Sequence, residues 1–166
     1  MIQERLKELR AQMQERGIDI YIVPTSDFHQ SEYVGEYFKA RKYMTGFTGS
    51  AGTAVITKEE AGLWTDGRYF IQAEKQLEGS TVKLFKMGEE GVPKVEEYVK
   101  DHLTEGSCIG FDGRVMDAKS GEKYAKMAEE KKAALYVKED LVGNIWKDRP
   151  QLPANKVWIL EDAYAG

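Results

Sequence analysis

Residues 41–72, RKYMTGFTGSAGTAVITKEEAGLWTDGRYFIQ, determine how the rest of the chain is arranged. Within this stretch, residues 51–57 and 62–65 are apolar and β-branched runs separated by a short polar segment, which predicts two antiparallel strands of a hairpin. Gly46, Gly49 and Gly52 lie before or at the start of the first strand and predict a loop with backbone angles that other residues avoid. Asp66 follows the second strand, where the N-cap of a helix belongs, and an apolar stripe beyond it predicts that helix.

Arg68 is the unusual residue of this stretch. A cation in the first turn of a helix opposes the helix dipole, which favours anions there by about 0.3–1 kcal/mol. In one interpretation Arg68 forms a local ion pair with Asp66 or Glu74, or is simply solvated. In the other, its guanidinium reaches away from the domain and binds a carbonyl or carboxylate, for which its planar fork is well suited. The residues alone favour the first interpretation.

Three strings in the first half of the chain resemble a known family. Residues 26–33 (SDFHQSEY), 45–57 (TGFTGSAGTAVIT) and 64–73 (WTDGRYFIQA) closely resemble the N-terminal domain of the three-domain, cytosolic-type Xaa-Pro aminopeptidases, or aminopeptidases P. These enzymes belong to the creatinase/prolidase group of metallopeptidases. The strings have matching order and spacing, and a weaker similarity extends through residues 141–153 (LVGNIWKDRPQLP).

The resemblance implies an activity that belongs to a longer protein. Members of the family remove the N-terminal residue from peptides whose second residue is proline, using a water between two divalent metals, usually manganese. The metal ligands belong to a C-terminal pita-bread domain that this sequence lacks, so no cofactor is expected in this chain itself. What carries over is Arg68, which matches the arginine of the family's WTDGRY motif, a peptide-binding residue lent to the active site by the first domain. Asp66 would orient it.

The composition is that of an ordinary globular domain and excludes several classes of function. Of 166 residues, 42 % are hydrophobic and 31 % are charged, and the formal net charge of −4 gives no basic face to attract nucleic acid. Cys108 is the one cysteine, so neither a disulfide nor a thiolate zinc cage can form within the chain. No apolar stretch is long enough to span a membrane, and the first helix is too charged for a signal peptide. We therefore expect a cytoplasmic protein.

Apolar periodicity predicts that strands and helices alternate along the chain. We expect helices over residues 2–16, 36–43, 66–77, 92–103, 117–132 and 141–146, and strands over 18–23, 81–85, 107–111 and 133–137. The run 18–23 is apolar on both faces, which places it at the centre of the sheet. Pro93 is expected in the first turn of its helix. With the hairpin, this alternation predicts an α/β fold, a mixed sheet of about six strands with helices on its faces, which by resemblance is ribonuclease H-like.

The polar, proline-containing segment 147–153 predicts a domain boundary. We assign residues 1–148 to the creatinase/prolidase-like N-terminal domain. Residues 149–166 are assigned to a linker and the start of a second, truncated domain, whose first strand is expected over 157–160. The chain is therefore interpreted as the first domain of a longer enzyme.

His29 lies in the polar loop that follows the central strand, and loops of this kind often carry functional residues. A metal site would need further ligands, and the other histidine, His102, lies in a predicted helix far along the chain. We therefore assign no metal to this chain. We expect His29 to be a hydrogen-bonded structural residue or to make a weak contact on the substrate side.

Asp66 and Asp112 are the carboxylates that a ribonuclease H-like nuclease would use to hold metals. Each precedes Gly-Arg, the composition of a turn or cap, which argues against that role. Three hypotheses remain open. The favoured one is a noncatalytic domain that shapes the substrate cleft of a dinuclear Xaa-Pro aminopeptidase, with its own C-terminal catalytic domain and proline peptides as partners and a homodimer as one assembly. The others are a free-standing binding or oligomerisation module and a nuclease.

Overall fold

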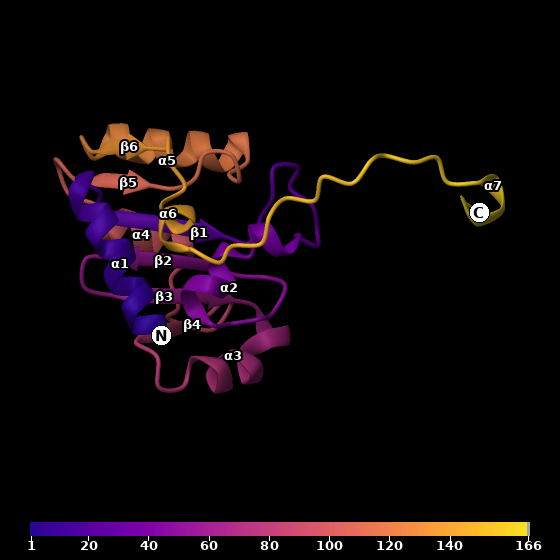
Figure 1. The fold of residues 1–166 in the computed structure, drawn as a ribbon. Helices are drawn as coiled ribbons and strands as arrows, with labels where there is room; N and C mark the ends of the chain where they lie inside the picture. The colour runs from indigo at the N-terminus through magenta and orange to yellow at the C-terminus, as the bar shows by residue number, and fades with distance from the viewer. Residues whose placement is uncertain (166) are drawn as a thin grey trace.

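The computed structural model describes residues 1–165, which form one six-stranded sheet with helices on both faces (Figure 1). The strand order is β4-β3-β2-β1-β5-β6. The strands are β1 (Ile20–Pro24), β2 (Thr53–Thr57), β3 (Ala61–Thr65), β4 (Val82–Lys86), β5 (Cys108–Gly110) and β6 (Ala134–Tyr136). β2 runs antiparallel to both of its neighbours, and the other pairs are parallel. The structure confirms the predicted mixed sheet and its hairpin.

Two hydrophobic cores lie on the two faces of the sheet. Successive residues of a strand point to opposite faces, so Tyr21 and Val23 belong to one core and Ile20 and Ile22 to the other. The first core is covered by α1 (Ile2–Glu15), α2 (Ala40–Thr45), α3 (Phe70–Leu77) and α6 (Leu141–Ile145), and the second by α4 (Val95–His102) and α5 (Ala118–Glu130). Because β1 is covered on both faces, its predicted central place is confirmed.

Four loops gather at one edge of the sheet. Because β2 runs against the other strands, the loop at its start lies at the same edge as the loops that follow β1, β3 and β5. We call residues 25–35, 46–52, 66–68 and 111–116 the loop edge. The loop after β1 projects on the right of the sheet in Figure 1. It is joined to its neighbours by a hydrogen bond from Thr25 Oγ1 to Gly52 O (2.7 Å) and one from Gln30 Nε2 to Val115 O (3.3 Å).

Three helix predictions require correction. The helix predicted over residues 66–77 is divided into a 3₁₀ helix, η2 (Gly67–Tyr69), and α3, because Tyr69 has a φ of −118° and a ψ of 0°. The helix predicted over residues 36–43 is divided into a 3₁₀ helix, η1 (Glu36–Phe38), and α2, because Lys39 between them has a ψ of 39°, outside the helical range. Pro93 lies outside α4, which begins two residues later after its N-cap Lys94. The carbonyl of Pro93 instead accepts a hydrogen bond from the buried Trp64 indole (2.8 Å), and the Glu97 carboxylate caps the helix at the Lys94 amide (2.8 Å).

The strand predicted over residues 157–160 is wrong. These residues are exposed and have no regular structure, and only the short helix α7 (Asp162–Ala165) follows them. The physical reason is that the backbone N–H and C=O groups of a strand need a neighbouring strand, and no strand of the described sheet lies beside this segment. The tail, drawn yellow in Figure 1, extends away from the sheet instead.

The tail leaves the folded body at Arg149. The Nε atom of Arg149 donates a hydrogen bond to Tyr37 O (2.8 Å), its guanidinium lies 3.8 Å from the centre of the Tyr37 ring, and Nη1 forms an ion pair with Asp140. Its side chain is only 13 % exposed. Arg149 is thus the last firmly packed residue before the tail, and the domain boundary between residues 148 and 149 remains a prediction.

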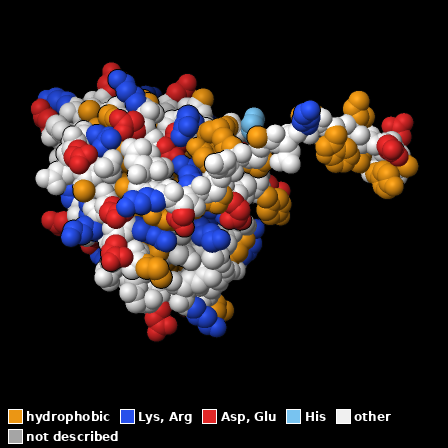
Figure 2. Space-filling model, in the orientation of Figure 1, with side chains coloured by type: hydrophobic (Ala, Val, Ile, Leu, Met, Phe, Trp, Pro, Cys, Tyr) orange, Lys and Arg blue, Asp and Glu red, His pale blue; other side chains and the backbone are white. Residues whose placement is uncertain are grey.

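The surface carries mixed charges. Figure 2 shows acidic and basic side chains interspersed over the visible face of the body, with no large area of one sign, and apolar side chains along the tail. Within residues 1–165, no helix is both long enough and apolar enough to cross a membrane.

Gly62 in β3 has no room for a side chain. Trp64 and Phe85 stack with their ring centres 3.9 Å apart, and a Cβ at Gly62 would lie 2.6 Å from both rings. We expect Gly62→Ala to lower the free energy of unfolding by about 2 kcal/mol, because the stacked rings would have to move. Urea denaturation measures the change.

The matched control for this prediction is Gly121→Ala. Gly121 lies inside α5, and a Cβ there would have no heavy atom within 4 Å. We expect this variant to be more stable than the wild type by about 0.5–1 kcal/mol, because alanine favours a helix. A Gly62→Ala protein as stable as the wild type would show that the rings are loosely packed.

Candidate functional site

Asp66 and Arg68 form a bidentate ion pair at the loop edge. Asp66 follows β3 and caps the 3₁₀ helix η2 (Gly67–Tyr69), as predicted. Its Oδ1 accepts hydrogen bonds from the Arg68 backbone amide (3.1 Å) and from Arg68 Nε (2.9 Å), and its Oδ2 accepts one from Arg68 Nη2 (2.8 Å). The pair holds the pKa of the Asp66 carboxyl below its usual range and raises the pKa of Arg68.

This geometry fits both interpretations of Arg68 in part. The local ion pair with Asp66 is present, as the first interpretation expected. The guanidinium is nevertheless not buried, since the Arg68 side chain is 69 % exposed. Its Nη1 makes no hydrogen bond to any residue that the structure describes, and lies free to donate to a partner. Asp66 therefore fixes the direction of a cation whose outer face remains available.

A second Asp-Gly-Arg tripeptide repeats this geometry at the end of β5. Asp112 Oδ1 accepts from the Arg114 amide (3.0 Å) and from Arg114 Nε (3.0 Å), and Asp112 Oδ2 accepts from Arg114 Nη2 (2.9 Å). Here the pair is tied more firmly to the domain, because Asp112 is buried and Arg114 also lies 3.6 Å from Asp140 and over the ring of Phe28. Asp66 caps a helix and Asp112 begins a turn, and both carboxylates already have a cation as partner.

His29 lies exposed in the loop after β1. Its backbone amide donates to Asp27 Oδ1 (2.8 Å), which also accepts from the Ser31 amide (3.0 Å), so the carboxylate of Asp27 organises this loop. These bonds keep the pKa of Asp27 below its usual range. Within the described residues, no hydrogen bond or ion pair joins His29 to Arg68 or to Asp66. The structure thus brings Asp66 and Arg68 together and leaves His29 apart from them.

The described residues offer no site for a pair of metal ions. In residues 1–165, no group of three or more His, Cys, Asp and Glu side chains is arranged to hold a metal ion. His102, the other histidine, stacks on Tyr98 and bonds to its carbonyl through Nδ1 (2.8 Å).

Arg41 is a site residue that sequence reasoning missed. Its side chain is enclosed, and the residue is 4 % exposed. It donates hydrogen bonds to Thr25 Oγ1 (2.9 Å), Phe47 O (2.6 Å) and Gly49 O. These bonds join residues 46–52, which we call the glycine loop, to the end of β1. Its neighbour Lys42 is exposed, and the pattern of two adjacent cations carries no sign of which one points inward.

The glycine loop is also joined to the segment that carries Arg68. Ser50 Oγ and Tyr69 Oη lie 2.6 Å apart in a hydrogen bond, and the Arg68 guanidinium lies 5.2 Å from the centre of the Tyr69 ring. The glycine loop thus contacts both cations, since its Gly49 carbonyl accepts from Arg41 and its Ser50 hydroxyl bonds to Tyr69, over whose ring Arg68 lies.

Comparison with known proteins assigns this domain to a family. The model of the Creatinase/Prolidase N-terminal domain matches residues 5–139. The chain belongs to the creatinase/prolidase N-terminal domain family. The match includes Asp66, Arg68 and the glycine loop, and confirms the resemblance drawn from the sequence strings.

Within this family, the chain is similar over nearly its whole length to aminopeptidases. Aminopeptidase P2 of Arabidopsis thaliana is 43 % identical over 171 residues, covering 100 % of this chain and 24 % of the relative. The X-prolyl aminopeptidase of Caenorhabditis elegans, described as a cytosolic enzyme with a di-nuclear active site, superposes with a TM-score of 0.85 and 35 % identity, covering 92 % of this chain and 26 % of that one. The chain thus spans about a quarter of the length of these proteins.

A further solved structure contains an N-terminal domain by itself. The N-terminal domain of the cytoplasmic peptidase PepQ from Mycobacterium tuberculosis H37Rv matches with a TM-score of 0.58 and 26 % identity, covering 86 % of this chain and 98 % of that chain. A domain of the creatinase/prolidase type therefore forms this fold without its catalytic partner.

Proposed function

We propose that this chain is the noncatalytic N-terminal domain of a cytoplasmic Xaa-Pro aminopeptidase, in which it shapes one side of the substrate cleft. The single observation that carries the proposal is the exposed guanidinium of Arg68, held in a fixed direction by Asp66 at an edge made of loops. The identity to aminopeptidases over the whole chain supports the choice of enzyme.

Arg68 is suited to bind a peptide across a domain interface. A guanidinium donates several hydrogen bonds in one plane, and a peptide offers carbonyl and carboxylate oxygens as acceptors. Because Asp66 already orients the side chain, less conformational entropy is lost when Arg68 binds a partner. A partly dry cleft would strengthen the interaction, because charges attract more strongly where water is excluded.

The reaction itself is assigned to the partner domain. The two divalent metals, which we propose to be manganese, would be held by the C-terminal catalytic domain of the same protein, and they would supply the activated water that cleaves the bond before proline. This chain contributes the oriented cation and the wall of the cleft. A homodimer of the longer protein is compatible with this arrangement.

The proposal predicts that this chain alone has no peptidase activity. With manganese added, purified chain is expected to release no N-terminal residue from an Xaa-Pro tripeptide above the rate in buffer, because residues 1–165 offer no group of metal ligands. Chromatography of the released amino acid measures the rate, and a full-length relative at the same concentration is the positive control. Manganese-dependent release by this chain would contradict the assignment of the reaction to another domain.

A further inference from the structure

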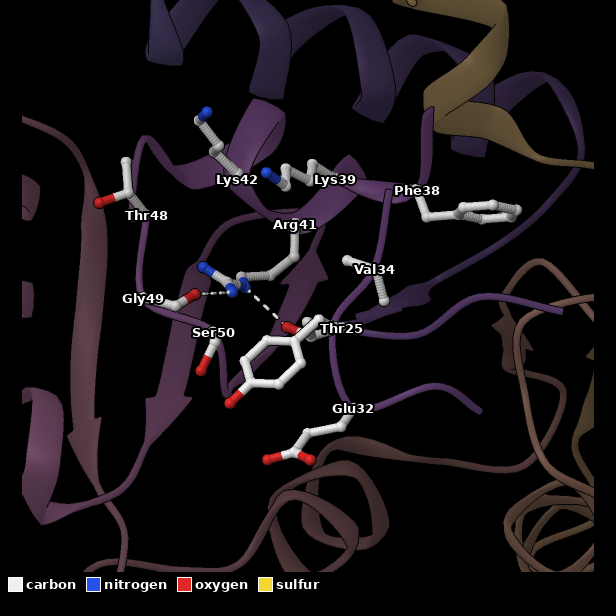
Figure 3. A pocket seen from close by; sticks show the side chains of 11 residues that line it. Thr25, Glu32, Val34, Phe38, Lys39, Arg41, Lys42, Thr48, Gly49 and Ser50 are labelled. Atoms are coloured by element: carbon white, nitrogen blue, oxygen red, sulfur yellow. Dashed lines mark hydrogen bonds between the residues drawn. The ribbon is translucent and has the colours of Figure 1, made fainter. Parts of the chain in front are cut away.

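A cavity of about 190 Å³ opens between the loop after β1, the start of α2 and the glycine loop (Figure 3). Arg41 forms part of its wall, and the guanidinium points toward Gly49 and Thr25 in Figure 3. Thr25 and Gly49 also line the cavity, together with Glu32, Tyr33, Val34, Phe38, Lys39, Lys42, Thr48 and Ser50. The cavity adjoins the segment of Arg68 through the hydrogen bond between Ser50 and Tyr69.

Arg41 enters this wall without a counter-ion. None of the ion pairs formed within residues 1–165 includes Arg41, although the residue is 4 % exposed. Burial lowers the pKa of Arg41 to about 10. The three hydrogen bonds of Arg41 go to a hydroxyl and two carbonyl groups, all of them uncharged. Since a guanidinium has five N–H groups, two remain for an additional acceptor.

The other charged groups of the cavity leave an excess of positive charge. Lys42 is exposed and makes no ion pair with the residues described, whereas Lys39 is paired with Glu36. Glu32 is the one acidic residue of the lining and lies at the far side of the cavity from Lys42 in Figure 3. A singly charged anion suits this balance, because two cations without ion-pair partners among the described residues, Arg41 and Lys42, stand against the single carboxylate of Glu32.

The remaining lining is apolar. Tyr33, Val34 and Phe38 form part of the wall, so the cavity offers cations and hydrophobic surface together. A planar guanidinium matches a planar carboxylate. A carboxylate attached directly to an apolar group is the chemistry of the last residue of a peptide.

We propose that this cavity binds the C-terminal residue of a short peptide, with its carboxylate toward Arg41 and Lys42 and its side chain against Tyr33, Val34 and Phe38. The inference rests on the proposed function, because it places the far end of the substrate next to Arg68. It adds a ligand class, short peptides with a free C-terminus, and a second recognition site on the loop edge.

The test is a binding experiment with this chain, so it requires no turnover. The tripeptide Ala-Pro-Leu, its C-terminal amide and Ala-Ala-Leu are titrated into ¹⁵N-labelled chain while the amide signals of Gly49 and Ser50 are followed by NMR. We expect Ala-Pro-Leu to bind at least tenfold more tightly than its amide and about as tightly as Ala-Ala-Leu, because the cavity recognises the terminus and not the proline. Equal affinity for the free acid and the amide would overturn the proposal.

Matched variants locate the binding in the cavity. Lys42→Glu and Lys126→Glu change the net charge equally, but Lys126 is an exposed residue of α5, on the opposite face of the sheet from α2. We expect at least fivefold weaker binding in Lys42→Glu and a change below twofold in Lys126→Glu. Arg41 is avoided here because it supports the fold. Equal effects of the two variants would show that the peptide responds only to net charge and would overturn the proposal.

A third arm separates two sources of a carboxylate. N-acetyl-glutamate amide presents a side-chain carboxylate without a free C-terminus, and we expect it to bind at least fivefold more weakly than Ala-Pro-Leu. Equal binding would assign the cavity to an acidic side chain of a partner and overturn the proposal. These binding results are independent of the peptidase assay. The proposed peptide site can therefore be wrong while the proposed function is right, and the proposed function can be wrong while the chain still binds the peptide.

Discussion

Replacing Arg68 with alanine in a full-length enzyme that contains this domain is expected to lower kcat/KM for an Xaa-Pro tripeptide by about 5- to 150-fold, equivalent to about 1–3 kcal/mol of transition-state stabilisation. The guanidinium is 69 % exposed and oriented by Asp66, so its loss should remove the proposed contact to the peptide and leave the core of this domain intact. Steady-state kinetics over a range of peptide concentrations measures the change.

The structure supplies a matched control in the second Asp-Gly-Arg tripeptide. Arg114→Ala removes a guanidinium with the same local geometry, and we expect it to change kcat/KM by less than twofold. Arg68→Lys keeps the charge but loses the planar fork, so an intermediate loss is expected. Equal effects of Arg68→Ala and Arg114→Ala would mean that the Asp-Gly-Arg turn acts only through local structure, and an unchanged Arg68→Ala enzyme would remove Arg68 from peptide binding.

Replacing Arg41 with methionine is expected to lower the free energy of unfolding of this chain by about 3 kcal/mol, because two buried backbone carbonyls and a hydroxyl lose a charged donor. The affected carbonyls belong to Phe47 and Gly49, so the glycine loop should lose its attachment to the end of β1. Urea denaturation followed by circular dichroism measures the loss, and hydrogen exchange at residues 46–52 localises it.

Arg10→Met is the control for this substitution. Arg10 is a partly buried arginine whose Nε donates one hydrogen bond, to Thr57 O (2.9 Å), and burial also lowers its pKa. We expect Arg10→Met to lower the free energy of unfolding by about 1 kcal/mol, because only one hydrogen bond is lost. Similar losses of stability in the two variants would mean that the three hydrogen bonds of Arg41 contribute no more to the free energy of unfolding than the single hydrogen bond of Arg10.

The sequence correctly predicted those elements whose residue pattern lies within one short segment of the chain. The hairpin of β2 and β3 follows from a β-branched run, an apolar and aromatic run and a polar turn between them. The cap at Asp66 follows from an acidic residue at a strand-to-helix corner. The central place of β1 follows from apolar residues on both of its faces. In each of these cases the residues that decide the structure are close together in the chain.

The predictions failed where contacts between residues far apart in the chain determine the local structure. Pro93 could have begun a helix, but its carbonyl is held by the indole of Trp64, 29 residues earlier in the chain. The run 157–160 has strand composition but no strand beside it. Arg41 was missed because its burial depends on carbonyls of a loop that folds over it, and adjacent cations give no periodic signal.

The anchoring of Arg149 has a consequence for how tightly two domains must bind each other. Arg149 holds the start of the tail against Tyr37 and Asp140, and Asp140 also lies beside Arg114 of the loop edge. In a longer protein, a following domain would therefore be tethered close to this edge at an effective concentration on the order of millimolar. At such a concentration even an association of millimolar affinity keeps the two surfaces together about half of the time, so the edge can remain polar and open to substrate.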